Sequence, residues 1–398
     1  MMEAGVRLIS MPGLDDRYDM QGHVYADPRL NARLVLPDVN LTGSLVLKPA
    51  LRFGYGRLTR LPSASQIYPA PVFNNVMELN YYSQNADLRR LYVATFEYDP
   101  TNDQLQPARN DKYEIGVDVR MAGAELQMTW FYEWCGNGFS SETMINPYSY
   151  NDYDESSVSS DGLTAPPELS MFRYETMYKT MMMSRFGNRA QMSKKGVEYT
   201  LSFPEIKAIR TSISLNGAWF RTHYGVAGND YDRPSVVINN QDYPYTAVYT
   251  SSLSDNQVRQ QFNTNLLLSL HIPQFRLLGT LSVQNMWFTS TKADVVSGIP
   301  EAYIDQYGNR HPFTADMVSD AYMSYMVKKF SDKYFLTSKV PFESVLNMKL
   351  SKEIGDKMLI SFYVNNLYCY EPNYKSKFDV VVRRLSVPYF GMELNLKL

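Results

Sequence analysis

The side chains able to do chemistry are few, and no group of them has the spacing of a catalytic or metal-binding site. The four histidines of the 398-residue chain are His23, His223, His271 and His311. None has a second histidine, a cysteine or a carboxylate at a usual ligand spacing, and the two cysteines stand far apart in the sequence. His223 falls at the end of an expected strand, where an outer-membrane hydrolase could carry its histidine, but no serine partner is evident. We therefore predict no catalytic residue, no cofactor, no metal ion and no enzyme activity.

Two acidic stretches alternate oxygen-bearing side chains in a way that could attract calcium. They are NDYDESS at residues 151–157 and GNDYDRP at residues 228–234. Calcium needs six or more oxygen ligands, and neither stretch has the glycine and the twelfth-position glutamate of an EF-hand loop. We expect both stretches to be solvated surface, and calcium binding stays open.

Tyrosines gather in the same two regions of the chain. Their rings have a flat apolar surface and a polar tip, which suits them to grip sugars or peptides. Packing of the loops against each other is an equally favoured explanation. The candidate ligand-binding residues, expected in extracellular loops, are Tyr148, Tyr150, Tyr153, Tyr231, Tyr243 and Tyr245.

The composition excludes several classes of protein. Lys and Arg number 39 against 41 Asp and Glu, and this near-neutral balance argues against a nucleic-acid surface. No run of 18 apolar residues occurs, so no transmembrane helix is predicted. The opening residues, MMEAGVRLIS, already alternate like a strand, and no signal peptide is visible in them.

Apolar side chains recur at every second position through about twelve segments, and this period is typical of strands with one apolar face. The clearest pair surrounds a break at residues 121–124. Before the break the apolar positions run from Tyr113 to Val119, and after it they run to Trp134. The expected strands lie at residues 2–10, 27–36, 44–58, 113–120, 126–134, 193–203, 211–221, 259–272, 276–288, 343–352, 357–366 and 390–398.

Short and long connections alternate along the chain. The short ones are residues 37–43, 121–124, 204–210, 273–275 and 352–356, and the long ones are 59–108, 135–185, 222–258 and 289–341. An outer-membrane barrel has this pattern, with short periplasmic turns, long extracellular loops and strands of ~9 to 11 residues across the bilayer. A soluble β-sandwich or propeller also alternates, but it does not explain such unequal connections. We predict an all-β, antiparallel transmembrane β-barrel domain over residues 1–398.

The polar residues between the apolar positions would then face the lumen, or a plug within it. These candidates are Lys48, Arg52, Glu114, Asp118, Arg120, Glu133, Glu198, Asn216, Asn265 and Lys349.

Several stretches resemble the carboxy-terminal barrel of TonB-dependent outer-membrane receptors, in particular the Bacteroidetes SusC-like type. They are MEAGVRLIS near the start, LVLKPALRFGYGRLTRLPS, NDKYEIGVDVR, KKGVEYTLSF, NMKLSKEIGDKMLISFYVNNLY and the closing PYFGMELNLKL. The resemblance covers nearly the whole chain and rests on the order and spacing of these stretches. One departure is Leu398, because members of the family usually end in an aromatic residue.

The resemblance implies the C-terminal part of a 22-stranded barrel that imports a bulky nutrient, a glycan or a peptide, with energy delivered through TonB. It implies as partners the lipid bilayer, the N-terminal barrel strands and plug domain (from the same gene or a partner chain), a SusD-like surface lipoprotein and TonB. The expected location is the outer membrane of a Gram-negative bacterium of the Bacteroidetes. The alternative is a self-contained 12-stranded passive pore, closed between the first and the last strand.

Overall fold

One large antiparallel sheet dominates the computed structural model, which describes residues 1–10, 23–42, 45–238, 240–250 and 256–396. Twelve strands follow one another across this sheet in chain order. They are β1 (Met2–Ser10), β2 (Val24–Val35), β4 (Leu45–Arg60), β7 (Ala108–Met121), β8 (Ala124–Tyr153), β9 (Tyr174–Ser202), β10 (Thr211–Val226), β15 (Gln257–Ile272), β16 (Leu277–Ala293), β20 (Glu343–Ile354), β21 (Met358–Tyr370) and β24 (Tyr389–Leu396). The short strands β3 (Val39–Thr42) and β19 (Ser338–Val340) pair with β4 and β16. The prediction of an all-β, antiparallel meander of about twelve strands is confirmed.

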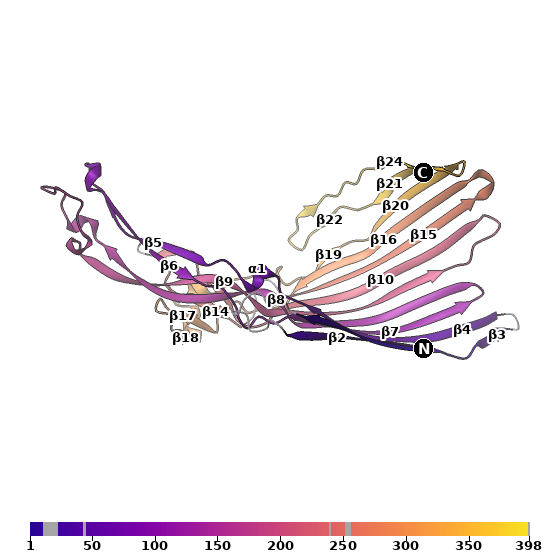
Figure 1. Cartoon of the computed structure of the whole chain (residues 1–398), viewed down its shortest axis with the longest axis horizontal. Coiled ribbons are helices and arrows are strands. Elements are labelled where there is room, and N and C mark those ends of the chain that lie inside the picture. The colour runs from indigo at the N-terminus through magenta and orange to yellow at the C-terminus, as the bar shows by residue number, and fades with distance from the viewer. Residues whose placement is uncertain (11–22, 43–44, 239, 251–255, 397–398) are drawn as a thin grey trace.

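The sheet is curved like a trough, and its two margins are the first and the last strand (Figure 1). Among the described strands β1 pairs only with β2, and β24 pairs only with β21. The predicted end of the last strand at Leu398 lies outside the described residues. The closure between the first and last strand that a self-contained pore needs is therefore not formed by the described strands.

Tight turns join the strands at one end of the trough, as the sequence predicted. The turn between β7 and β8 has only two residues, Ala122 and Gly123, with φ angles of 49° and 84°. Positive φ at both positions is the geometry whose twist matches the two strands of a hairpin. The turn after β15 is the 3₁₀ helix η4 (Pro273–Phe275), which ends at Arg276 with φ of 46°.

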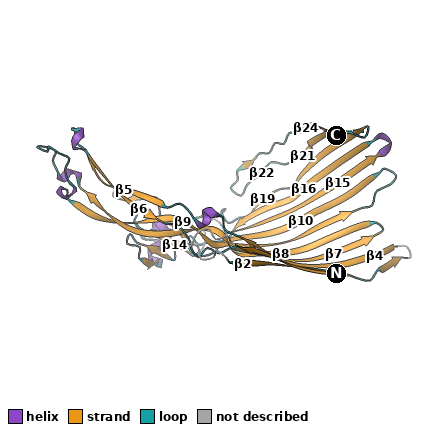
Figure 2. Ribbon diagram, in the orientation of Figure 1, coloured by secondary structure: helices purple, strands orange, loops and turns teal. Residues whose placement is uncertain are grey.

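The opposite end carries the long connections, and one of them differs from the prediction. Residues 135–185, expected as a loop, are mostly strand, because β8 and β9 have 30 and 29 residues and continue far beyond the sheet as a two-stranded arm (Figure 2). Its sequence, rich in Ser, Asn and Tyr, has no apolar period. Small separate elements, such as the β5–β6 hairpin and β11, cover the arm in place of one apolar layer, so its strands need no continuous apolar face.

Smaller elements pack around this arm. The hairpin β5 (Val72–Tyr81) and β6 (Arg90–Tyr98) contacts β8, and β11 (Asp230–Asp232), β14 (Thr246–Tyr249), β17 (Ala302–Ile304) and β18 (Arg310–Pro312) form a four-stranded sheet. The remaining pieces are α1 (Ala64–Ile67), η1 (Ala86–Leu88), η2 (Glu155–Ser157), η3 (Leu169–Met171), β12 (Val237–Ile238), β13 (Gln241–Asp242), η5 (Ala315–Val318), η6 (Met323–Met326), β22 (Tyr374–Lys375) and β23 (Val381–Val382). We call the arm with the β5–β6 hairpin, the four-stranded sheet and their connections the outer module, and the rest of the twelve-stranded sheet the wall.

Clusters of fully buried apolar side chains lie in the outer module. One contains Ile67 and Leu105, a second Tyr243, Ala247, Tyr249 and Met326, and a third Leu79, Tyr81 and Phe172. No helix among the described residues is both long and apolar enough to cross a bilayer.

Candidate functional site: a two-faced wall and an outer cleft

The wall has two chemically different sides, because successive side chains of a strand point to opposite faces. Cross-strand pairing aligns an apolar row over six strands. The row consists of Phe53, Ile115, Trp130, Val197, Trp219 and Phe262. The exposed fractions are 46% for Phe53, 48% for Ile115 and 42% for Trp130, and the other three side chains of the row are partly exposed. We call this side the apolar face.

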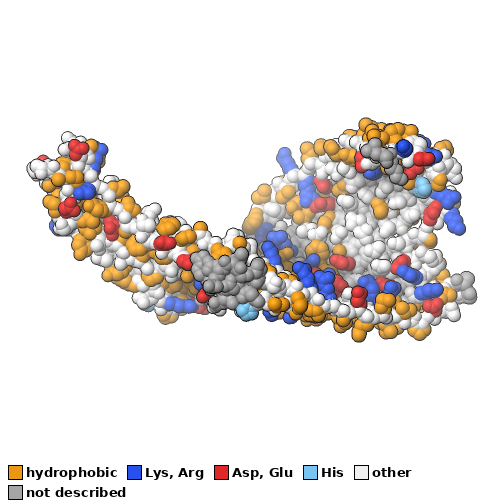
Figure 3. Space-filling model, viewed as in Figure 1, with side chains coloured by type: hydrophobic (Ala, Val, Ile, Leu, Met, Phe, Trp, Pro, Cys, Tyr) orange, Lys and Arg blue, Asp and Glu red, His pale blue; other side chains and the backbone are white. Residues whose placement is uncertain are grey.

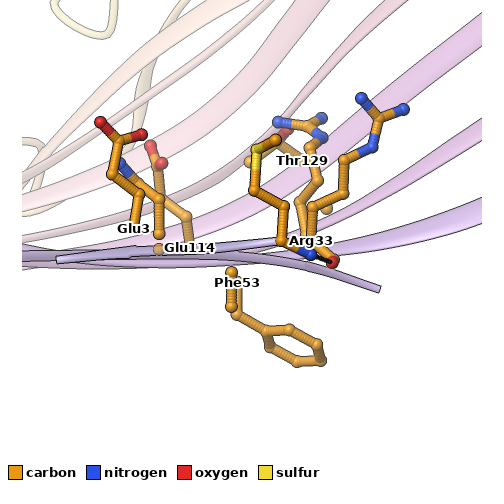
Figure 4. A pocket seen from close by; sticks show the side chains of 11 residues that line it. Glu3, Arg33, Phe53, Glu114 and Thr129 are labelled. Atoms are coloured by element: carbon orange, nitrogen blue, oxygen red, sulfur yellow. Dashed lines mark hydrogen bonds between the residues drawn. The ribbon is translucent and has the colours of Figure 1, made fainter. Parts of the chain in front are cut away.

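The other side, which we call the polar face, lines the hollow of the trough. Figure 3 shows white, blue and red side chains in this hollow, while hydrophobic side chains in orange gather around its margins. Figure 4 shows the same division at the β1 margin: Phe53 points to one side of the ribbon, and Glu3, Arg33, Glu114 and Thr129 point to the other. A hollow of about 230 Å³ lies among these side chains.

Ion pairs join neighbouring strands on the polar face, and Asp118 is the centre of the best-connected group. Its carboxylate accepts a hydrogen bond from Arg52 at 2.8 Å and lies 3.2 Å from Arg33. Arg52 also donates to Thr129 at 2.9 Å, and the Arg52 guanidinium lies over Gly116, where a Cβ atom would come within 2.9 Å of it. Asp118 is 4% exposed, but both arginines are more than one third exposed, so solvent screens the attraction.

The other predicted lumen residues lie on the same face in the arrangement that the alternation indicates. The contacts are Lys112 with Glu114 at 2.6 Å and with Glu133 at 3.7 Å, Arg120 with Glu125 at 3.1 Å, Asn265 with Asn216 at 3.0 Å, and Lys349 with Glu393 at 2.9 Å. Lys48 stands opposite Arg120, and Glu198 stands opposite Thr129. The structure thus brings all ten candidates to one face, and their lumen role stays a prediction.

Two phenylalanines lie on the polar face that were not predicted from the sequence. Phe131 is only 1% exposed, and the ammonium groups of Lys112 and Lys194 lie 5.3 and 5.2 Å from its ring centre. Lys194 also lies 4.9 Å from the ring of Phe220. Gly196 leaves room for Phe131, because a Cβ there would meet the ring at 2.8 Å. A glycine opposite an aromatic residue is the signal that could have revealed this arrangement.

The outer module contains a cleft of about 520 Å³ between the arm and the β12–β13 region. Its lining includes Tyr150, Lys179, Arg233 and Asp242, and Lys179 lies 3.5 Å from Asp242. Burial works against the charge of Lys179, but the nearby Tyr150 and Asp242 favour the charge, and together they raise the pKa of Lys179. Burial lowers the pKa of Arg233, whose guanidinium is held by Thr180 and Thr246. The cleft combines several tyrosine side chains, among them Tyr150 and Tyr178, with charges of both signs.

The six candidate tyrosines are divided by the structure. Tyr148, Tyr150 and Tyr153 lie on strand β8 and not in a loop, which corrects the predicted location. Tyr150 lines the cleft, whereas the ring of Tyr148 packs on Phe96 with centroids 4.9 Å apart.

The remaining tyrosines mostly pack inside the outer module. Tyr153 joins one apolar cluster, and Tyr243 and Tyr245 join another. Tyr243 is 1% exposed, and burial raises its pKa. Tyr231, on β11, lines a second hollow of about 520 Å³ together with Glu142 and Arg185. Tyr150 and Tyr231 therefore have the more accessible positions for a ligand.

The predicted acidic stretches form local structure. Asp154 accepts hydrogen bonds from the backbone and side chain of Ser156, and Asp232 pairs with Lys328. Among the described residues no group of three or more His, Cys, Asp or Glu side chains is arranged to hold a metal ion.

His223 has a partner that the sequence did not reveal. Its Nε2 atom lies 2.7 Å from Oδ2 of Asp294, and Ser193 stands opposite it on β9. No hydrogen bond joins Ser193 to His223 in the part of the chain that is described, so the three residues do not form the hydrogen-bonded Ser-His-Asp relay of a hydrolase.

Comparison with known proteins finds only distant structural similarity. No family model matches the chain, and no curated protein matches it. Among solved structures it is similar to the outer membrane transporter YddB from Escherichia coli, with 11% identity, a TM-score of 0.25, and coverage of 92% of this chain and 51% of that one. It is also similar to a mutant of the ferric enterobactin receptor PfeA from Pseudomonas aeruginosa, with 11% identity, a TM-score of 0.21, and coverage of 92% and 53%. The chain spans about half the length of these two proteins.

Proposed function

We propose that this chain forms part of the wall of an outer-membrane transport barrel, with its apolar face in the lipid and its polar face toward the lumen. The observation that carries this proposal is the exposure of large apolar side chains on one whole side of the wall. Ile115, Trp130 and Phe362 are 48%, 42% and 57% exposed, and similar residues recur on the strands between them. A water-soluble protein rarely exposes a continuous apolar surface of this size.

A soluble sandwich would need a second layer on the apolar face. In the described ranges, the additional sheets β5–β6, β11–β14–β17–β18 and β12–β13 belong to the outer module, and the remaining one, β22–β23, has two residues in each strand and lies in the connection between β21 and β24. Lipid is the solvent that favours an apolar outer face together with a polar, ion-paired inner face. The proposal therefore assigns the exposed row from Phe53 to Phe262 to the lipid boundary.

The open margins lead to a second part of the proposal. In lipid each unpaired backbone group costs several kcal/mol, so β1 and β24 need strand partners. We infer that further strands close the barrel, supplied by the same protein or by a partner chain. The resemblance of MEAGVRLIS and VNNLY to the SusC-like type suggests a complete barrel with a plug domain, a SusD-like lipoprotein and coupling to TonB.

The transported substance would be a bulky nutrient, a glycan or a peptide, that contacts the outer module. Of the six candidate tyrosines, Tyr150 and Tyr231 line hollows there without being buried, and Lys179, Arg233 and Asp242 line the same hollow as Tyr150. Aromatic faces beside paired charges suit either class of ligand.

Uptake by cells tests the transport proposal. Cells that carry the complete protein should accumulate a labelled oligosaccharide or peptide only when TonB is present. Equal uptake with and without TonB, accompanied by steady ion conductance of the protein in planar bilayers, would favour the passive pore and reject active transport.

A further inference from the structure

Two cations face each other on the apolar face without any partner among the described residues. Lys195 of β9 and Arg221 of β10 occupy directly opposed positions, and both side chains are exposed. Neither forms an ion pair, hydrogen bond or cation–π contact within the ranges that the structure describes. Like charges directly opposite each other on a sheet are destabilising, so this pair costs stability unless an anion lies between them.

Their position in the row pattern indicates where such an anion would be. One step outward from the apolar row, pairing aligns Tyr55, Tyr113 and Tyr132, and the same row continues as Lys195 and Arg221. Tyrosines at the end of an apolar band mark the boundary between hydrocarbon and headgroups. The two cations therefore lie at headgroup level if the apolar face lies in lipid.

The cations border a hollow of about 340 Å³ whose remaining lining is rich in hydrogen-bond donors. Tyr132 and Ser193 contribute hydroxyl groups to it. The only carboxylate in the lining, Asp294, already interacts with His223 at 2.7 Å. The hollow thus combines two positive charges and two residues with hydroxyl groups with a single carboxylate, that of Asp294.

We propose that this hollow binds the phosphate group of an outer-leaflet lipid, with Lys195 and Arg221 as its charged ligands. A guanidinium binds two phosphate oxygens at once, and an ammonium adds a compact positive charge. Trp219 lies one step inward on the same strand and face, so the acyl chains would extend along the apolar row. This inference rests on the proposed function, because it requires the apolar face to contact lipid.

Quenching of tryptophan fluorescence by brominated lipids tests the lipid-facing wall and the phosphate-binding hollow separately. The four tryptophans of the chain are Trp130, Trp134, Trp219 and Trp287. The purified protein, in the assembly in which it is isolated, would be inserted into phosphatidylcholine bilayers with increasing fractions of brominated phosphatidic acid, a phosphate monoester. Preferential quenching by the brominated phosphatidic acid reports occupation of the site.

The double variant K195Q/R221Q should weaken the preference for phosphatidic acid about 30-fold, since each cation near a membrane surface contributes ~1 kcal/mol. The matched control K207Q/K357Q removes two exposed cations from the tight-turn end and should leave the preference unchanged. The variant K195R/R221K keeps both charges and should retain most of it.

Three outcomes would overturn the inference. Equal preference in K195Q/R221Q and the unchanged protein would show that these cations do not bind the lipid. Displacement by millimolar inorganic phosphate would assign the hollow to free phosphate instead of a lipid. If K207Q/K357Q lost the preference for phosphatidic acid as strongly as K195Q/R221Q, the effect would come from net charge and not from this hollow. Brominated phosphatidylcholine should quench all variants equally, and failure of that quenching would reject the membrane-facing wall itself.

Discussion

The wall and the outer module belong to the same chain but differ in where their apolar side chains lie: the outer module buries them, and the wall exposes them on one face. In the outer module, Tyr243, Ala247 and Met326 are at most 1% exposed and pack against each other. In the wall, Ile115 and Trp130 remain more than 40% exposed although their strands are long and regularly paired. The wall has backbone order without an apolar core of its own.

This difference separates two sources of stability. The outer module buries apolar surface within itself, as a protein in water must. The wall has regular hydrogen bonding and a network of ion pairs on its polar face, and it leaves its apolar side for a neighbour. If that neighbour is lipid, substitutions on the two regions should follow different rules, and the following predictions use that contrast in order of decreasing effect.

Removal of a buried side chain should have the largest effect, and it should be confined to the outer module. Met326→Ala should lower the free energy of unfolding of this region by about 2–5 kcal/mol, because Met326 is 0% exposed and the change leaves a cavity. Hydrogen exchange of residues 230–249 and 302–328, which leave out the wall strands β15 and β16, would measure it. The matched change Met171→Ala, at a position that is 50% exposed, should stay within about 0.5 kcal/mol. Equal effects would contradict the assignment of a packed core to this region.

A charge on the apolar face should be costly although the position is exposed. Met128 is 43% exposed and shares β8 with its neighbour Gln127, which lies on the polar face. Met128→Lys should cost about 2–4 kcal/mol if the position lies near the bilayer midplane, whereas Gln127→Lys should be nearly neutral. Urea titration of folding into vesicles gives both numbers. Two near-neutral results would indicate that water, not lipid, borders this side.

The ion-pair network of the polar face should contribute less. Asp118→Asn removes the shared partner of Arg33 and Arg52 and should cost about 1 kcal/mol at low salt, because solvent screens both arginines. High salt should reduce the loss of unfolding free energy caused by Asp118→Asn, which the same titration would measure. Glu393→Gln, which removes the partner of Lys349 at a more exposed site, is the control and should cost less. A cost for Asp118→Asn that does not change with salt would argue against a water-filled space at this face.

Acidification should have the smallest of these effects, a slight loss of stability in the outer module. Asp305 is partly buried, which opposes its charge, but hydrogen bonds from His311, Asn309 and Tyr307 prevail and hold its pKa below the ordinary 3.8. A lowered carboxyl pKa stabilises the fold above the unfolded pKa, and this contribution is lost as the pH falls through the folded value. The β17–β18 region should therefore loosen slightly below about pH 3.8. Asp305→Asn should remove this pH dependence, which circular dichroism during acid titration would detect.

Much of the wall could be predicted from the sequence, because alternation and turn chemistry are local signals. Each of the twelve expected strands overlaps a strand of the sheet, and the break at residues 121–124 is a two-residue turn. The row from Phe53 to Phe262 follows from the same period of two.

The outer module was less predictable for physical reasons. The arm formed by β8 and β9 is covered by small elements distant in the sequence and not by one apolar layer, so residues 135–153 carry no apolar period although they are strand. The strands β11, β14, β17 and β18 have three or four residues each, and their pairing joins residues as distant in the sequence as Val248 and Ala302. Likewise, only the fold reveals that Tyr243 is buried and that Asp294 meets His223.

The most direct test of the two-faced wall is thiol labelling of two adjacent positions. In a protein whose own cysteines are replaced (Cys135→Ser and Cys369→Ser), Gln127→Cys and Met128→Cys would be exposed to a membrane-impermeant maleimide in outer-membrane vesicles made permeable to it. We expect rapid labelling at position 127 and no labelling at position 128 until detergent dissolves the membrane. Equal labelling of both positions in the intact membrane would contradict it.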